Sequence, residues 1–65
     1  MNVKQTLEHL TMCKVYIDIC GECKALNMYP HVALKTLDDE VLKSPVGRMY
    51  PCLNEFNDVC IVIEA

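Results

Sequence analysis

The sequence predicts an α+β protein with a long N-terminal helix, a second, shorter helix and a C-terminal β-hairpin. Three patterns support this fold class. Apolar residues recur at helical spacing near the N-terminus, prolines delimit a helical segment in the middle, and β-branched residues gather in the run 59–63. With 65 residues, the chain is expected to form one small domain, 1–65, which buries only about 60% of the surface that its unfolded form exposes.

The first predicted element is a long helix that begins near residue 3. One apolar stripe at helical spacing runs through the first third of the chain: Val3, Leu7, Leu10, Cys13, Ile17 and Cys20. No glycine, proline or asparagine stands between Leu7 and Ile19 to end such a helix. Gly21 costs a continuous helix about 1 kcal/mol, which is tolerable. The helix would be apolar around most of its circumference in its second half.

A β-strand is the alternative for residues 13–19. Cys13, Val15, Ile17 and Ile19 alternate there with more polar residues, at the period of a strand. The C-x-x-C segment would then lie at a strand-to-helix turn. A helix ending near Thr11 leaves no residues for a turn before that strand, although connections usually have about two or more. The helix is therefore preferred.

The middle block is expected to form the second helix. Pro30 suits its first turn and Pro45 ends it after Ser44. Thr36, followed by the acidic residues 38–40, indicates a later start for this helix as an alternative.

The last block predicts a hairpin, with arms at 48–53 and 59–63 and a turn at 54–58. Pro51 confines the first arm to a sheet edge, because it cannot donate a ladder hydrogen bond. A lone hairpin is marginal in water. These strands are therefore expected to pack on the helices or to pair across a dimer.

Charge and hydropathy exclude some function classes. The net charge is −3, and the lysines are single rather than clustered, so direct binding to nucleic acid is not expected. No apolar run approaches the roughly 20 residues of a membrane span, and no membrane association is expected. Apolar, aromatic and cysteine residues make up 52% of the chain. This exceeds what one small core can hide, so we expect a protein partner or a homo-oligomer.

Five cysteines in 65 residues is a high and odd number. A secreted disulfide framework normally has an even count, and the N-terminus lacks a signal-peptide pattern. The thiols are therefore expected to be reduced in a cytoplasmic protein, where cysteine often packs as a small hydrophobe.

The segment Cys20-Gly21-Glu22-Cys23-Lys24 resembles the C-G-x-C-K active site of thioredoxin-like oxidoreductases. In that family a strand leads the first cysteine to a helix N-terminus, which lowers the pKa of its thiol. The resemblance implies that Cys20 attacks and Cys23 resolves. Glu22 stands where the family usually has proline, and no tryptophan precedes the motif.

A structural zinc site is the other chemical alternative. Cys20, Cys23, His31 and Cys52 are a conceivable Cys₃His ligand set. A zinc ion would add folding free energy to so small a chain. The preferred prediction is that the chain holds no metal and no cofactor, because a second C-x-x-C is missing.

The leading functional expectation is a non-enzymatic protein that binds another protein and acts as a regulator or inhibitor. Small chains without catalytic groups often have such roles, including those encoded by phages and mobile elements. Arg, Met and Tyr are enriched at interface centres. The candidate partner-binding residues are therefore Met28, Tyr29, Arg48, Met49 and Tyr50. The apolar side of the long helix supplies the candidate oligomer interface: Met12, Tyr16 and Ile19.

Overall fold

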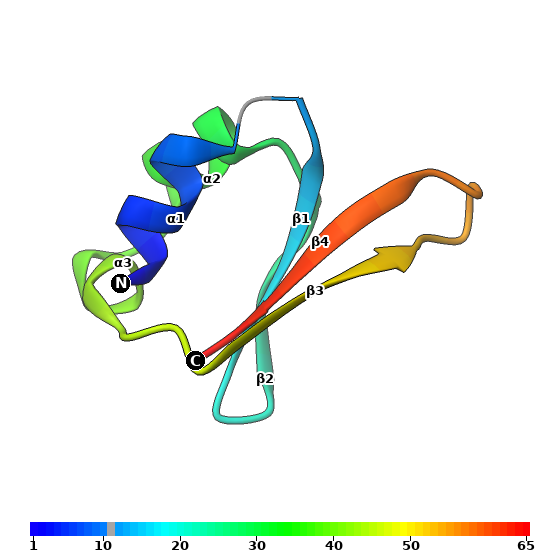
Figure 1. The fold of residues 1–65 in the computed structure, drawn as a ribbon. Helices are drawn as coiled ribbons and strands as arrows, with labels where there is room; N and C mark the ends of the chain where they lie inside the picture. Colours follow the sequence, from blue (N-terminus) through cyan, green and yellow to red (C-terminus); the bar gives the residue numbers. More distant parts are fainter. Residues whose placement is uncertain (11) are drawn as a thin grey trace.

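A computed structural model describes residues 1–10 and 12–65 as an α+β arrangement of short helices and one mixed sheet (Figure 1). The described elements are α1 Val3–His9, β1 Lys14–Ile19, β2 Glu22–Met28, α2 Pro30–Thr36, α3 Asp39–Lys43, β3 Arg48–Leu53 and β4 Val59–Glu64. The strand order in the sheet is β2-β1-β4-β3. The two central strands, β1 and β4, run parallel, and each pairs with an antiparallel edge strand.

The predicted long N-terminal helix is wrong. Helix α1 covers only Val3–His9 and β1 begins at Lys14. A capping box between Asn2 and Gln5 starts the helix, and Leu10 ends it in extended conformation. Thr11, where the end of a shorter helix was considered, lies outside the described residues.

The reason for this error lies in β1, which pairs with β4 residue by residue from Lys14 to Asp18. This pairing is made with residues almost fifty positions away and does not appear in a local helical pattern. The objection that no residues remain for a turn also fails, because α1 ends at His9 and residues 10–13 separate it from the strand.

The C-x-x-C segment forms a tight hairpin turn between two strands, not a strand-to-helix turn. Ile19 and Glu22 are paired, and the two residues between them, Cys20 and Gly21, have φ of 51° and 82°. Positive φ at both central positions is the mark of a type I′ hairpin turn. Cys23 then lies in β2. Strand β1 thus agrees with the strand alternative for 13–19, but the helix that should have followed it is absent there.

The middle block is divided into two helices, not one. Helix α2 begins at Pro30, as predicted, but ends at Thr36. Asp38 then stands as the N-cap of α3, one residue after the extended Leu37. A single helix to Ser44 is therefore wrong, and the second start lies at Asp38 rather than Thr36.

The two arms of the C-terminal hairpin occupy the predicted residues, and β4 runs one residue further to Glu64. Strand β3 is an edge strand, as Pro51 predicted. The hairpin is not alone, however: its strand β4 is central in a four-stranded sheet. Figure 1 shows the helices gathered beside one end of the sheet, with the hairpin of β3 and β4 reaching away from them.

The main core lies between the helices and one face of the sheet. Its buried members are Val3, Leu7, Val15, Ile17, Ala25, Ala33, Val41, Leu42 and Ile63. Strand alternation turns the neighbours of these strand residues to the other face. We call this other face the open face, and it carries Tyr16 on β1, Cys60 and Val62 on β4, and Tyr50 and Cys52 on β3.

The sheet curls toward its open face. The side-chain amide of Asn54, at the tip of the β3–β4 hairpin, donates a hydrogen bond of 3.0 Å to Asn27 Oδ1, near the end of β2. Strands β3 and β2 are the opposite edges of the sheet, so this contact crosses β1 and β4. The curl explains why Cys60, on the open face and outside the main core cluster, is 0% exposed.

Candidate functional site

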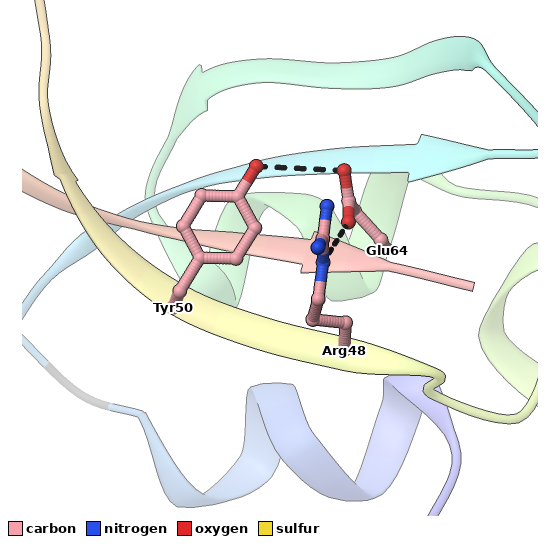
Figure 2. Close-up of polar contacts among 3 residues, drawn as sticks. All are labelled: Arg48, Tyr50 and Glu64. Atoms are coloured by element: carbon pink, nitrogen blue, oxygen red, sulfur yellow. Dashed lines mark hydrogen bonds and ion pairs between the residues drawn. The ribbon is translucent and has the colours of Figure 1, made fainter.

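A polar cluster lies at one end of the open face, on the paired strands β3 and β4. Arg48 and Glu64 are register partners, and Arg48 Nε donates a 2.6 Å hydrogen bond to Glu64 Oε1. The Tyr50 hydroxyl donates to the other carboxylate oxygen at 3.4 Å. Figure 2 shows the Tyr50 ring and the Arg48 side chain both directed toward Glu64. The guanidinium carbon also lies 5.2 Å from the centre of the Tyr50 ring, within the range of a cation–π contact.

These contacts shift the pKa values of Arg48 and Glu64 in the directions that favour their charged forms. The hydrogen bond from Arg48, with its positive charge, lowers the pKa of Glu64 below its ordinary value. The same hydrogen bond raises the pKa of Arg48. Both groups are therefore charged over the physiological pH range. Glu64 therefore holds the side chains of Arg48 and Tyr50 in place, and neither Arg48 nor Glu64 takes up or releases a proton near neutral pH.

A pair of cysteines lies further along the same face. Cys52 on β3 and Cys60 on β4 are register partners in the antiparallel ladder. Cys52 is exposed and Cys60 is fully buried. Burial raises the pKa of the Cys60 thiol, and the neighbouring Cys52 raises it further. The buried thiol is thus a poor nucleophile, and the exposed one faces solvent.

Tyr16 occupies the neighbouring position on β1, between the cysteine pair and β2. Desolvation raises the pKa of its hydroxyl, and the negative forms of Cys60 and Glu55 contribute in the same direction. Tyr16 therefore stays neutral at physiological pH. It packs over the curled sheet as a half-buried ring rather than as an acid or base.

A second surface is apolar. Strand alternation directs Met49, Leu53 and Val59 to the helix side of the hairpin, where the helices leave them exposed. The exposed residues Met12 and Tyr29 adjoin Val59 at the end of the sheet. We call these five residues the apolar surface. Leu53 and Val59 are register partners on the two strands. Met12, Tyr29 and Val59 line one open hollow, together with the charged residues Lys14 and Asp58.

The structure separates some of the predicted partner-binding residues. Met49 lies on the apolar surface, whereas Arg48 and Tyr50 point to the open face, because consecutive strand residues alternate. Tyr29 is exposed at the start of α2, and Met28 is partly buried against the core. The five residues therefore do not form one patch. Their role in binding a partner stays a prediction.

The candidate oligomer-interface residues are also separated. Met12 is 85% exposed and joins the apolar surface. Tyr16 lies on the open face, and Ile19 packs against the main core. These three residues shared a face only in the long helix, which does not exist. Of the three, Met12 alone remains available on the apolar surface.

The residues proposed for thiol or zinc chemistry are not gathered into a site. Within the described part of the chain, no group of three or more His, Cys, Asp and Glu side chains is placed to hold a metal ion. Cys20 lies in the β1–β2 turn, Cys23 on β2, His31 on α2 and Cys52 on β3. His31 instead stacks on the Tyr29 ring, with 5.9 Å between the ring centres. Cys20 also lacks the helix N-terminus that activates the thioredoxin-like cysteine.

The sequence carried a usable signal for the cysteine pair that was missed. The predicted turn at 54–58 is centred on Phe56, and Cys52 and Cys60 are equally far from it along the two arms. Residues so placed in a hairpin face each other across the ladder. Leu53 and Val59, one position closer to the turn, are equally far from Phe56 and face each other for the same reason.

Comparison with known proteins adds no assignment: the chain matches no protein-family model, no curated protein and no solved structure. Among residues 1–10 and 12–65, no helix is both long enough and apolar enough to cross a membrane.

Proposed function

We propose that this chain is a non-enzymatic protein-binding regulator that works as a homodimer, with the apolar surface as the contact between the two copies. The observation that carries the proposal is the exposure of the large side chains of that surface: Leu53 is 61% exposed, Val59 59% and Met49 49%. Apolar side chains gathered on one face and rimmed by charge are typical of protein-interaction sites.

The charges favour a second copy of this chain as the occupant. The strand residues that face outward on this part of the hairpin are uncharged, so two copies meet there without like-charge repulsion. The hollow at its border carries one positive residue, Lys14, and one negative residue, Asp58. A two-fold axis brings each patch against itself, with residue i meeting residue j and j meeting i. Lys14, whose ammonium lies 5.4 Å from the centre of the Tyr29 ring, then pairs with Asp58 of the other copy.

The contact is expected to be face to face rather than edge to edge. Strand β3 is an exposed edge, but Pro51 interrupts its row of N–H donors. Asn54 N–H bonds Asp58 O, and alternation of the ladder then places Pro51 at a position whose backbone points outward. An added strand would therefore lose a hydrogen bond in the middle of its length.

Sedimentation equilibrium tests the proposal, with concentrations reaching tens of micromolar. We expect a dimer for the wild-type chain. Leu53→Thr is expected to weaken its association about tenfold or more, since burying one leucine side chain stabilises a contact by roughly 1.5 to 3 kcal/mol. Threonine keeps the strand propensity.

Leu26→Thr is the matched control. Leu26 is as exposed as Leu53, at 63%, but lies on β2, the opposite edge strand. It should leave dimerisation unchanged. A strictly monomeric wild-type chain, or equal weakening by the two variants, would show that the apolar surface is not the dimer contact.

A further inference from the structure

The pair Cys52 and Cys60 stands apart from the other cysteines of the chain. The two residues oppose each other directly in the β3–β4 ladder. Because Asn54 N–H bonds Asp58 O two positions further along, alternation makes Cys52 and Cys60 a hydrogen-bonded pair, whose Cα atoms are about 5.5 Å apart. That Cα separation falls within the range of about 4.4 to 6.8 Å seen for disulfides, but the Cβ atoms of a hydrogen-bonded pair are about 5 Å apart, wider than the roughly 3.5 to 4.5 Å of a relaxed disulfide. The ladder must therefore tighten locally for the bond to form, which makes the bond easy to reduce. Register partners also point to the same side of the sheet.

The remaining cysteines lack such a partner among the described strands. Cys23 faces Asp18, Cys20 lies in the tight turn, and Cys13 lies just before β1, outside the paired ladder. Strand β1 separates β2, which carries Cys23, from β4, which carries Cys60. Geometry therefore selects one pair out of the five thiols.

We propose that Cys52 and Cys60 are a redox modification site that forms a reversible intramolecular disulfide by exchange with a low-molecular-weight disulfide such as oxidised glutathione. The exposure of the two thiols sets the order of the steps. Cys52 is exposed and meets the reagent first, whereas Cys60 is 0% exposed and lies opposite Cys52 in the ladder.

The exchange balances in two steps. The Cys52 thiolate, having lost its proton to solvent, attacks one sulfur of oxidised glutathione, and the S–S bond of the reagent breaks to release one glutathione thiolate. The Cys60 sulfur then attacks the Cys52 sulfur, the mixed disulfide bond breaks, and the departing glutathione thiolate takes up the proton that Cys60 gives up. Two cysteine thiols are oxidised to one disulfide, and one glutathione disulfide is reduced to two thiols. An excess of reduced dithiol reverses both steps.

Burial makes the second step the slow one. Desolvation raises the pKa of the Cys60 thiol, and exchange proceeds through the thiolate. The mixed disulfide on Cys52 should therefore be visible before the ring closes.

The test uses the full chain with Cys13, Cys20 and Cys23 replaced by serine, so that only the proposed pair remains. After incubation with oxidised glutathione, thiol titration and intact mass are measured under denaturing, non-reducing conditions. We expect loss of both thiols and a monomer lighter by two hydrogens, with a glutathione adduct appearing first. Rates independent of protein concentration would mark ring closure as intramolecular.

Cys52→Ser in the same background is the main variant, because an exposed side chain is replaced and folding is little affected. Its Cys60 should stay a free thiol in folded protein. Peptide mapping of the oxidised wild-type chain provides a second readout that needs no substitution. A glutathione adduct that persists on Cys52, disulfides only between chains, or two thiols that remain unreacted would each overturn the proposal.

Discussion

Replacing Asn54 tests the reasoning that the sheet is held in its curled form by its hairpin tip. Asn54 is 8% exposed, and its side chain makes three hydrogen bonds. Its Oδ1 accepts from the N–H groups of Phe56 at 2.9 Å and Asp58 at 3.0 Å, and its Nδ2 donates to Asn27 at 3.0 Å. Each such bond contributes about 1 kcal/mol net.

Asn54→Ala is therefore expected to lower the free energy of unfolding by about 2 to 3 kcal/mol. Phe56 and Asp58 are exposed, so water can hydrate their freed N–H groups and no large additional penalty arises. A chain of this size has a total stability of roughly 3 to 10 kcal/mol, so the loss is easily measured by urea denaturation followed by circular dichroism.

A double-mutant cycle isolates the contact that crosses the sheet. Asn54→Asp keeps the acceptor oxygens but loses the donor to Asn27. Asn27→Gly removes the acceptor while tolerating the positive φ of 53° at that position. We expect a coupling free energy of about 0.5 to 1.5 kcal/mol between them. A coupling near zero, or an Asn54→Ala variant as stable as wild type, would refute the role assigned to this contact.

Three further predictions concern the turn, the core and the polar cluster. Gly21→Ala should lower the free energy of unfolding in urea by about 1 to 2 kcal/mol. The loss comes from backbone strain at φ 82° alone, because nothing lies within 4 Å of the added Cβ. The control Cys20→Asn creates the preferred Asn-Gly turn and should leave the free energy of unfolding at or above that of the wild-type chain. Ile17→Ala should cost about 3 kcal/mol in urea unfolding, since Ile17 is 0% exposed. The folded-state pKa of Glu64 is lowered from 4.5, so Glu64 adds stability that is present above about pH 4.5 and is lost as the pH falls through the folded-state pKa. In unfolding curves measured at several pH values, the Glu64→Gln variant should therefore lose less of its free energy of unfolding on acidification than the wild-type chain does.

The C-terminal half of the fold was accessible from local patterns. The run of β-branched residues at 59–63 predicted the second arm of the hairpin, and Pro51 placed the first arm at a sheet edge. Pro30 marked the start of α2 correctly, because its position depends only on backbone geometry. These signals act within a few residues of one another, so no knowledge of distant parts of the chain was needed.

The N-terminal half was not accessible in the same way. Residues 13–20 satisfy a helical period and a strand period at once, and the decision rests on the parallel partner β4. The division of the middle helix at Leu37 likewise has no proline or glycine to announce it. The apolar surface was misplaced for the same reason, because its position depended on a helix that does not form. The composition of the chain predicted that exposed apolar residues exist, but not where they lie.

The curl of the sheet links the cysteines to the size of this chain. Sixty-five residues leave little material for a second layer over the open face, so the sheet bends over its own central strands, β1 and β4. The space inside such a bend is narrow, and the buried residues there, Cys60 and Val62, are small. Cysteine packs there as a small hydrophobe. It remains a thiol, however, and the same register that buries Cys60 places the exposed Cys52 opposite it. The position of Cys60 in the ladder therefore accounts both for its packing and for the reactivity of its thiol toward Cys52. Cys60→Val would keep the packing and remove the thiol.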